Sequence, residues 1–230
     1  MQDGPASDIE MCGQRLCGDS AGALYWPAER ILVVADLHLE KGSSFARRGV
    51  LLPPYDTAAT LSNLAAVVAR HDPRIVISLG DSFHDGEGAQ RLSPADRETL
   101  SGLQRGRDWI WISGNHDPDP AVDIGGVFSD CVSIGPFVFR HEPGGGSDEN
   151  EIAGHLHPMA RVHVRGRTMS RKCFASDGRR MVMPAFGAYT GGLNVRDRAF
   201  AAIFEALDFT AHMLGPTRLY AISATHCLPD

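Results

Sequence analysis

Three short apolar runs rich in β-branched residues mark the first half of the chain. They are ILVVAD at residues 31–36, RIVISLGD at 74–81 and WIWIS at 109–113. A run of this length and composition predicts a buried β-strand.

Helical patterns separate these runs. A polar loop with Gly42 and Gly49 follows the first run, and a helix should then begin near Asp56 or Thr57, which are both suitable N-caps. Its buried face follows the i, i+3, i+4, i+7 pattern through Leu61, Leu64, Ala65 and Val68. A second helix should open at Ser93 in SPADRETL, with the serine as its cap. The β-α-β-α-β order predicts parallel strands joined by crossovers.

From about residue 126 the helical signal fades. Short strands are expected in VSIGPFVFR, EIAGHLH, ARVHVRG, RRMVMPAF and FAAIFEAL, which glycine, proline or aspartate separates. No linker or low-complexity tract divides the 230 residues, so we predict one domain spanning 1–230. Within it we expect an N-terminal strand region at 1–25, a βαβ half at 26–125 and a β-rich half at 126–230.

Composition narrows the class of protein. A hydrophobic content of 43% with 22% charged residues is ordinary for a soluble globular protein, and no apolar run approaches a membrane span. The amino terminus lacks the features of a secretory signal. Five cysteines without zinc-like pairs argue for reduced thiols, although Cys12 and Cys17 could pair. A cytoplasmic location without a membrane partner is therefore the expectation.

The charge is acidic overall but basic in one window. The formal net charge is −6, which argues against a nucleic-acid binder that depends on total charge. Seven cations crowd residues 161–180 beside one acid, Asp177. They are compatible with a surface that tracks phosphates and equally with an ordinary solvated face.

Polar side chains follow the predicted strands where each strand ends. Asp36-x-His38 ends the first, Gly80-Asp81 the second and Gly114-Asn115-His116-Asp117 the third; His141 and then His155-x-His157 follow later strands. Ligands bind at the carboxyl ends of strands in open α/β sheets. On an extended backbone, residues two apart project the same way, so each D-x-H or H-x-H pair could reach one cluster. Carboxylate, imidazole and amide groups without thiolates suit two divalent ions such as Mn, Fe or Zn. Each motif alone is weak, but the ordered set points to a dinuclear metal centre.

These motifs, over residues 31–158, resemble the calcineurin-like metallophosphoesterases. The resemblance implies an α/β fold, a four-layer α/β/β/α sandwich with two metals at the strand ends. It implies that Asp36, His38 and His157 bind one metal, that Asn115, His141 and His155 bind the other, and that Asp81 bridges both. It also implies phosphoester hydrolysis by a metal-bound hydroxide, with His116 as a catalytic group facing the phosphate. Asp117 would accept a hydrogen bond from the His116 ring, or would simply be a turn residue.

Longer stretches suggest a substrate. GDSFHD resembles the nuclease branch of the family, and DLHLEKGSSFARRG, LPPYDT, FRHEP, EIAGHLHP and MPAFGAYTGGLN resemble bacterial ligase-associated DNA damage response endonucleases. This resemblance implies a manganese-favouring phosphodiesterase that cuts single-stranded DNA in repair, with a DNA ligase and a helicase as partners. His84, Arg47 and Arg48 are candidate substrate contacts, while Phe45, Phe83 and Tyr189 could stack bases or belong to the core. A hydrolase of small phosphoesters or nucleotides, and a non-catalytic scaffold, remain alternatives.

Overall fold

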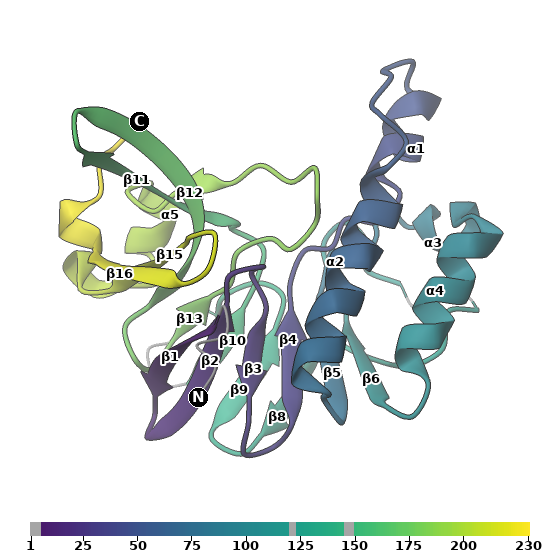
Figure 1. Cartoon of the computed structure of the whole chain (residues 1–230), viewed down its shortest axis with the longest axis horizontal. Helices are drawn as coiled ribbons and strands as arrows, with labels where there is room; N and C mark the ends of the chain where they lie inside the picture. The colour runs from purple at the N-terminus through teal and green to yellow at the C-terminus, as the bar shows by residue number, and fades with distance from the viewer. Residues whose placement is uncertain (1–5, 120–122, 145–149) are drawn as a thin grey trace.

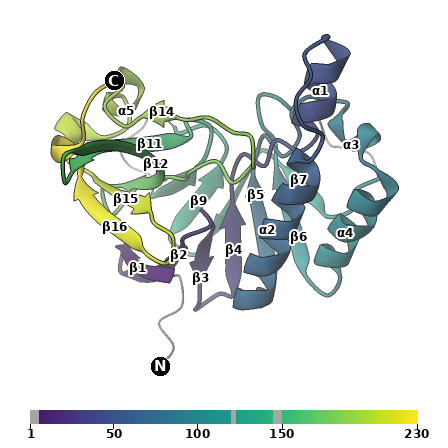
Figure 2. The ribbon, with the colours of Figure 1, turned by 45° about the horizontal axis from the view of Figure 1, so that its top comes forward.

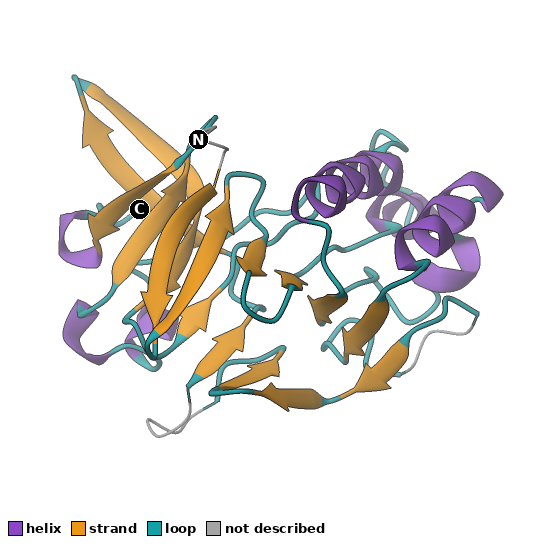
Figure 3. Ribbon diagram, turned by 60° about the horizontal axis from the view of Figure 1, so that its bottom comes forward, coloured by secondary structure: helices purple, strands orange, loops and turns teal. Residues whose placement is uncertain are grey.

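Two β-sheets face each other at the centre of the molecule, and helices lie on their outer sides (Figures 1 and 3). The computed structural model describes residues 6–119, 123–144 and 150–230. In the described part of the chain no helix is long and apolar enough to cross a bilayer.

The first sheet has seven strands in sequence order. They are β1 (Ala6–Met11), β2 (Gln14–Asp19), β3 (Leu24–Trp26), β4 (Ile31–Val34), β5 (Ile75–Leu79), β6 (Asp108–Ile112) and β7 (Val127–Ser129). Strands β1 to β4 pair antiparallel, and β4 to β7 pair parallel. The predicted parallel order of the three apolar runs is confirmed. Strand β7 belongs to this sheet, so the first half extends slightly past residue 125.

Four helices connect these parallel strands. They are α1 (Lys41–Arg47), α2 (Asp56–His71), α3 (Gly88–Arg91) and α4 (Pro94–Gln104). The expected polar loop around Gly42 instead contains α1, which projects beyond α2 (Figures 1 and 2). Helix α2 starts where predicted, but Tyr55 is its N-cap, and the Asp56 carboxylate accepts a hydrogen bond from the Gly42 amide at 3.0 Å. Ser93 caps α4 as predicted.

The second sheet has nine strands. They are β8 (Cys131–Ile134), β9 (Phe137–Arg140), β10 (Glu151–Ala153), β11 (Pro158–Val164), β12 (Arg167–Ser176), β13 (Met181–Val182), β14 (Leu193–Asn194), β15 (Thr210–Leu214) and β16 (Leu219–Ser223). Two 3-10 helices, Glu205–Leu207 and Ala224–His226, lie in the same half. The predicted strand in FAAIFEAL is wrong: Asp197 caps the short helix α5 (Arg198–Ala201) there. Phe200 and Phe204 are buried, but Ala202 between them is exposed, whereas an alternating strand would bury all three on one face.

Three apolar clusters hold the layers together. One fills the space between the sheets and includes Trp26, Phe137 and Phe174. A second joins the first sheet to α2 and α4, and a third joins the second sheet to α5. The predicted four-layer α/β/β/α sandwich is confirmed. All five cysteines, including Cys12 and Cys17, are free.

Candidate metal centre

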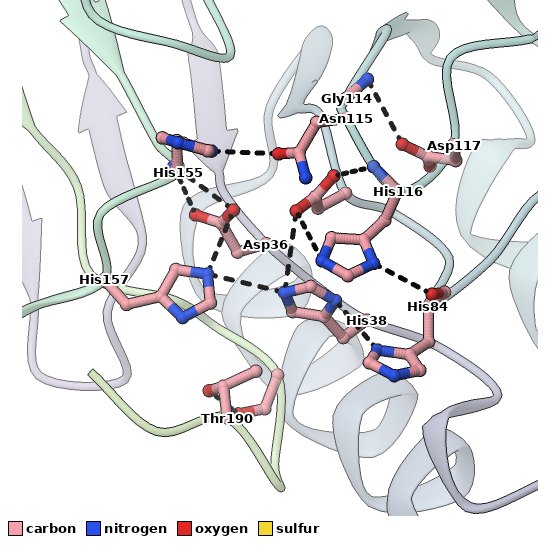
Figure 4. Close-up of polar contacts among 12 residues, drawn as sticks. Asp36, His38, His84, Gly114, Asn115, His116, Asp117, His155, His157 and Thr190 are labelled. Atoms are coloured by element: carbon pink, nitrogen blue, oxygen red, sulfur yellow. Dashed lines mark hydrogen bonds and ion pairs between the residues drawn. The ribbon is translucent and has the colours of Figure 1, made fainter. Parts of the chain in front are cut away.

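Seven of the polar side chains singled out in the sequence converge at the carboxyl ends of the central strands. Figure 4 labels Asp36, His38, Asn115, His155 and His157 among them. The seven come from the segments that follow β4, β5, β6, β9 and β10: Asp36, His38, Asp81, Asn115, His141, His155 and His157. Asp36 is fully buried, and Asp81 and His141 are 3% and 4% exposed. The fold therefore gathers groups that are up to 121 positions apart in sequence (157 − 36).

The backbone at five of these positions is not extended, contrary to the expectation for the D-x-H and H-x-H pairs. Asp36, His38, Asp81, His155 and His157 have φ angles of 53°, 44°, 46°, 70° and 48°. Non-glycine residues in this left-handed region cost about 1–3 kcal/mol each and concentrate at functional sites. Each side chain reaches the centre because the chain turns sharply after its strand.

Two glycines make room for these side chains. A Cβ on Gly80, whose φ is +71°, would lie 2.5 Å from the His141 ring. A Cβ on Gly114 would lie 2.1 Å from the Asp81 amide nitrogen and 2.3 Å from its carboxylate. The glycines that begin the GD and GNHD motifs are therefore required by close approach.

One group of donors consists of Asp36, His38 and His157. The His157 Nε2 atom lies 3.2 Å from Asp36 Oδ1 and 3.4 Å from His38 Nε2. The backbone amide of His155 donates to both Asp36 oxygens, at 3.1 and 3.2 Å, and so fixes the carboxylate. These three side chains could hold one metal ion.

A second group consists of Asn115, His141 and His155. The Asn115 Oδ1 atom lies 2.9 Å from both His141 Nε2 and His155 Nδ1, and those nitrogens are 3.2 Å apart. The His141 Nδ1 atom must carry a hydrogen, because it contacts the Leu79 carbonyl at 2.8 Å. In a neutral ring Nε2 is then an acceptor that faces the Asn115 oxygen, another acceptor. A cation between them removes this conflict.

Asp81 lies between the two groups. Its Oδ2 atom is 3.8 Å from His38 Nε2, and its Oδ1 atom is 3.5 Å from His141 Nε2. Metal–ligand bonds of about 2.1 Å place neighbouring ligand atoms about 3 Å apart in octahedral geometry, close to the separations seen here. Distance alone also groups Asp36 with Asp81 and His141. Since Leu79 occupies His141 Nδ1, the Nε2 side that faces Asn115 is the one available to a metal.

Two of the histidines, His38 and His155, are in the neutral form that metals require. Burial, together with the charges of the neighbouring His157 and His116, lowers the pKa of His38 to about 2. Burial and His141 also lower the pKa of His155. These rings are neutral near pH 7 and keep lone pairs for a divalent ion. The donor set fits hard or borderline cations, and no thiolate contributes.

His116 and Asp117 differ from expectation in their partners. The His116 Nδ1 atom contacts the His84 carbonyl at 3.1 Å, and the His116 amide donates to Asp81 Oδ1 at 2.9 Å. The Asp117 carboxylate instead accepts from the amides of Gly114, at 3.2 Å, and Phe83, at 3.0 Å. Burial raises the pKa of Asp117 to about 7. The predicted hydrogen bond from the His116 ring to Asp117 is therefore wrong: Asp117 joins the loops after β5 and β6, and His84 orients the ring.

Of the candidate substrate contacts, His84 lines the cleft at the centre, whereas Arg47 and Arg48 line a separate depression. The His84 ring stacks on His116, with centroids 5.2 Å apart, and its Nδ1 atom is 3.4 Å from His38 Nδ1. Burial, followed by the charge of Lys41, lowers the pKa of His84 to about 4. Arg47 forms an exposed ion pair with Glu87, and Arg48 is exposed.

The basic window at 161–180 divides into two kinds of residue. Arg180 is buried and paired with Glu151, and Lys172 donates from the interior to Ala185, Gly187 and Thr190. Burial lowers the pKa of Lys172 to about 8. The exposed members are Arg165, Arg167, Arg171 and Arg179, and the half-buried Arg161 donates to the Pro229 carbonyl. Two of the cations are therefore structural, and Phe83 is likewise a core residue at 2% exposure.

An open cleft exposes the centre to solvent. Its volume is about 420 Å³, and it is lined by His38, Lys41, His84, His116, His155, Leu156, His157 and Gly191–Leu193. A second depression of about 470 Å³ lies beside Asn115 and His141. Lys41 was not singled out from the sequence, because no motif marks it and its place in the cleft depends on a contact with the distant Tyr189 carbonyl.

Comparison with known proteins gives matches to a family model and to solved structures, and one negative result. The family model described as calcineurin-like phosphoesterase matches residues 29–169. The crystal structure of Pseudomonas putida nuclease MPE is similar, with a TM-score of 0.72 and 30% identity over 94% of this chain and 100% of that one. No curated protein matches the sequence. The chain therefore belongs to the calcineurin-like phosphoesterase family and is a metal-dependent phosphoesterase.

Proposed function

We propose that this protein is a dinuclear phosphodiesterase that cuts single-stranded DNA as a repair endonuclease. The observation that carries the proposal is the position of Asp81, whose two oxygens face different donor groups, 3.8 Å from His38 and 3.5 Å from His141. One carboxylate shared by two nitrogen- and oxygen-rich groups is the arrangement expected of a two-metal site. The similarity to a bacterial nuclease supports a nucleic-acid substrate.

Asp36, His38 and His157 would hold one ion, Asn115, His141 and His155 would hold the other, and Asp81 would contact both. When bound, two divalent ions supply an activated water and neutralise charge on the phosphoryl oxygens. Manganese is the proposed ion, with iron or zinc as alternatives that the same donor types accept.

His116 would act on the substrate directly. Its Nδ1–H donates to the His84 carbonyl, which leaves Nε2 as the free ring nitrogen, 4.0 Å from Asp81 Oδ2. The ring is 43% exposed at the cleft, where a proton on Nε2 can neutralise a phosphoryl oxygen. Because the His116 amide also donates to Asp81, ring and carboxylate keep a fixed relative position. Asp117 would act as a positioning residue that holds the GNHD loop.

The open cleft favours a polymer over a small phosphoester. The stacked rings of His84 and His116 line the cleft, and the exposed Arg48 lines a separate depression; both suit a flexible strand. The motif resemblance to ligase-associated endonucleases supports action in DNA repair, in the cytoplasm, beside a DNA ligase and a helicase.

A cleavage panel tests the proposal. Wild-type protein with manganese should cut a single-stranded oligonucleotide and a generic diester, and Asp81→Asn prepared in the same way should cut neither. Cleavage of the diester and of nucleotides without cleavage of DNA would instead identify a small-molecule hydrolase. If wild-type protein cleaves no phosphoester with any of the three metals, the proposed function is wrong.

A further inference from the structure

Lys41 is a cation on the wall of the metal cleft. It is the first residue of α1 and lines the cleft together with His38, His84 and His116. Its Nζ atom donates to the Tyr189 carbonyl at 3.0 Å and lies 5.9 Å from the centre of the Phe45 ring. The ammonium is therefore held beside the centre by a neutral acceptor and an aromatic face.

Among the described residues no carboxylate forms an ion pair with Lys41, and Asp56 acts on its charge only from beyond contact distance. None of the ion pairs among the described residues includes Lys41, whereas two arginines on the same side, Arg47 and Arg91, pair with Glu87 and Asp85. Half-burying a cation costs free energy unless an anion offsets it. An anionic ligand in the cleft would offset it.

The position of Lys41 is fixed from both sides. The Glu40 carboxylate accepts from Thr57 at 2.9 Å and from Ser43 at 2.6 Å, which anchors the start of α1. On the other side, Tyr189 is followed by Thr190, whose hydroxyl accepts a hydrogen bond from the half-buried Lys172 at 2.7 Å. This ammonium is preorganised, unlike that of a free surface lysine.

We propose that Lys41 binds the phosphate adjacent to the scissile one, on the His38–His84 side of the centre, and so favours a polynucleotide over a small phosphoester. This inference rests on the proposed function. The metal ligands and His116 serve the scissile phosphate, while a neighbouring phosphate carries a charge of its own that needs a separate cation. The Phe45 ring, 5.5 Å from the His84 ring, offers a surface for the attached base.

The test compares Lys41→Met with Lys41→Arg on two substrates. One is a single-stranded oligonucleotide, and the other is bis(p-nitrophenyl) phosphate, a diester without a neighbouring phosphate. For Lys41→Met we expect kcat/KM on DNA to fall about tenfold, as for loss of one charge-assisted contact, with less than about a twofold change on the small diester. For Lys41→Met, the slope of log(kcat/KM) on DNA against log salt concentration should become shallower by about 0.7. Lys41→Arg should restore most of the lost activity and most of this slope.

Arg105→Met is the matched control, because Arg105 is exposed after α4, at the amino ends of the parallel strands. Arg105→Met should leave kcat/KM unchanged on both substrates. Equal losses on both substrates in Lys41→Met, or an unchanged salt slope, would overturn the inference while the nuclease function stands. If wild-type protein cuts only the small diester, the proposed function fails and the inference fails with it.

Discussion

Replacing Asp81, the carboxylate that faces both donor groups, should weaken manganese binding. Asp81→Asn keeps the size of the side chain, and its amide oxygen can still accept the His116 N–H that Asp81 Oδ1 accepts at 2.9 Å. The substitution removes the negative charge of Asp81, a residue that is 3% exposed and whose two oxygens face the two donor groups. The expected loss is therefore one of metal affinity rather than of fold.

The magnitude follows from binding linkage. At a manganese concentration one hundred times the Kd of a site, binding to the folded state adds about 2.7 kcal/mol to the free energy of unfolding. For a chain of this size 1 kcal/mol shifts Tm by about 2–4 °C, so each site adds about 5–10 °C. Two occupied sites in wild-type protein should raise Tm by about 10–20 °C, and Asp81→Asn should lose most of that rise.

The assay is scanning calorimetry of chelator-treated protein with and without manganese. Asp19→Asn is the control, because Asp19 is a fully buried aspartate that contacts Arg70 and His71 rather than the metal centre. It should lower Tm in both conditions and keep the manganese shift. A wild-type manganese shift in Asp81→Asn would refute the bridging role.

Three further outcomes are expected. His116→Gln should keep its manganese content, measured by plasma mass spectrometry, while kcat falls about 10²–10⁴-fold; metal loss equal to that of Asp81→Asn would contradict this division of roles. Gly114→Ala should lose manganese, because its Cβ would lie 2.3 Å from the Asp81 carboxylate; full manganese content would argue against this packing. Burial opposes ionisation of Asp19, but hydrogen bonds, led by the one from His71, lower the pKa of its carboxyl group. The ionised carboxylate therefore stabilises the fold above the ordinary carboxyl pKa, and this stabilisation is lost as the pH falls below that value. In urea unfolding, Asp19→Asn should lower the free energy of unfolding by about 1.5–3 kcal/mol at pH 7 and by less at pH 3. An equal difference between wild-type protein and Asp19→Asn at the two pH values would exclude this linkage.

The sequence was most informative where a strand ends in a polar residue. Parallel strands bring their carboxyl ends to one edge, so Asp36, Asp81 and Asn115 could be grouped before any coordinates were known. The same reasoning fails for the local backbone. Asp36 and His157 lie in left-handed turns, which only the packing of neighbouring loops sets.

Tertiary contacts account for the other differences. Asp117 and the His116 ring are adjacent in sequence, but each takes its partner from the loop after β5, where Phe83 and His84 lie. Lys41 carries no motif of its own, and its place in the cleft depends on the carbonyl of Tyr189, 148 residues away. Long-range contacts of this kind have no signature in a single sequence.

Anomalous diffraction from a crystal grown with excess manganese tests the central claim most directly. We expect two peaks per chain, one bonded to Asp36, His38 and His157 and the other to Asn115, His141 and His155, with Asp81 touching both. A single peak, or peaks away from these side chains, would contradict the dinuclear centre.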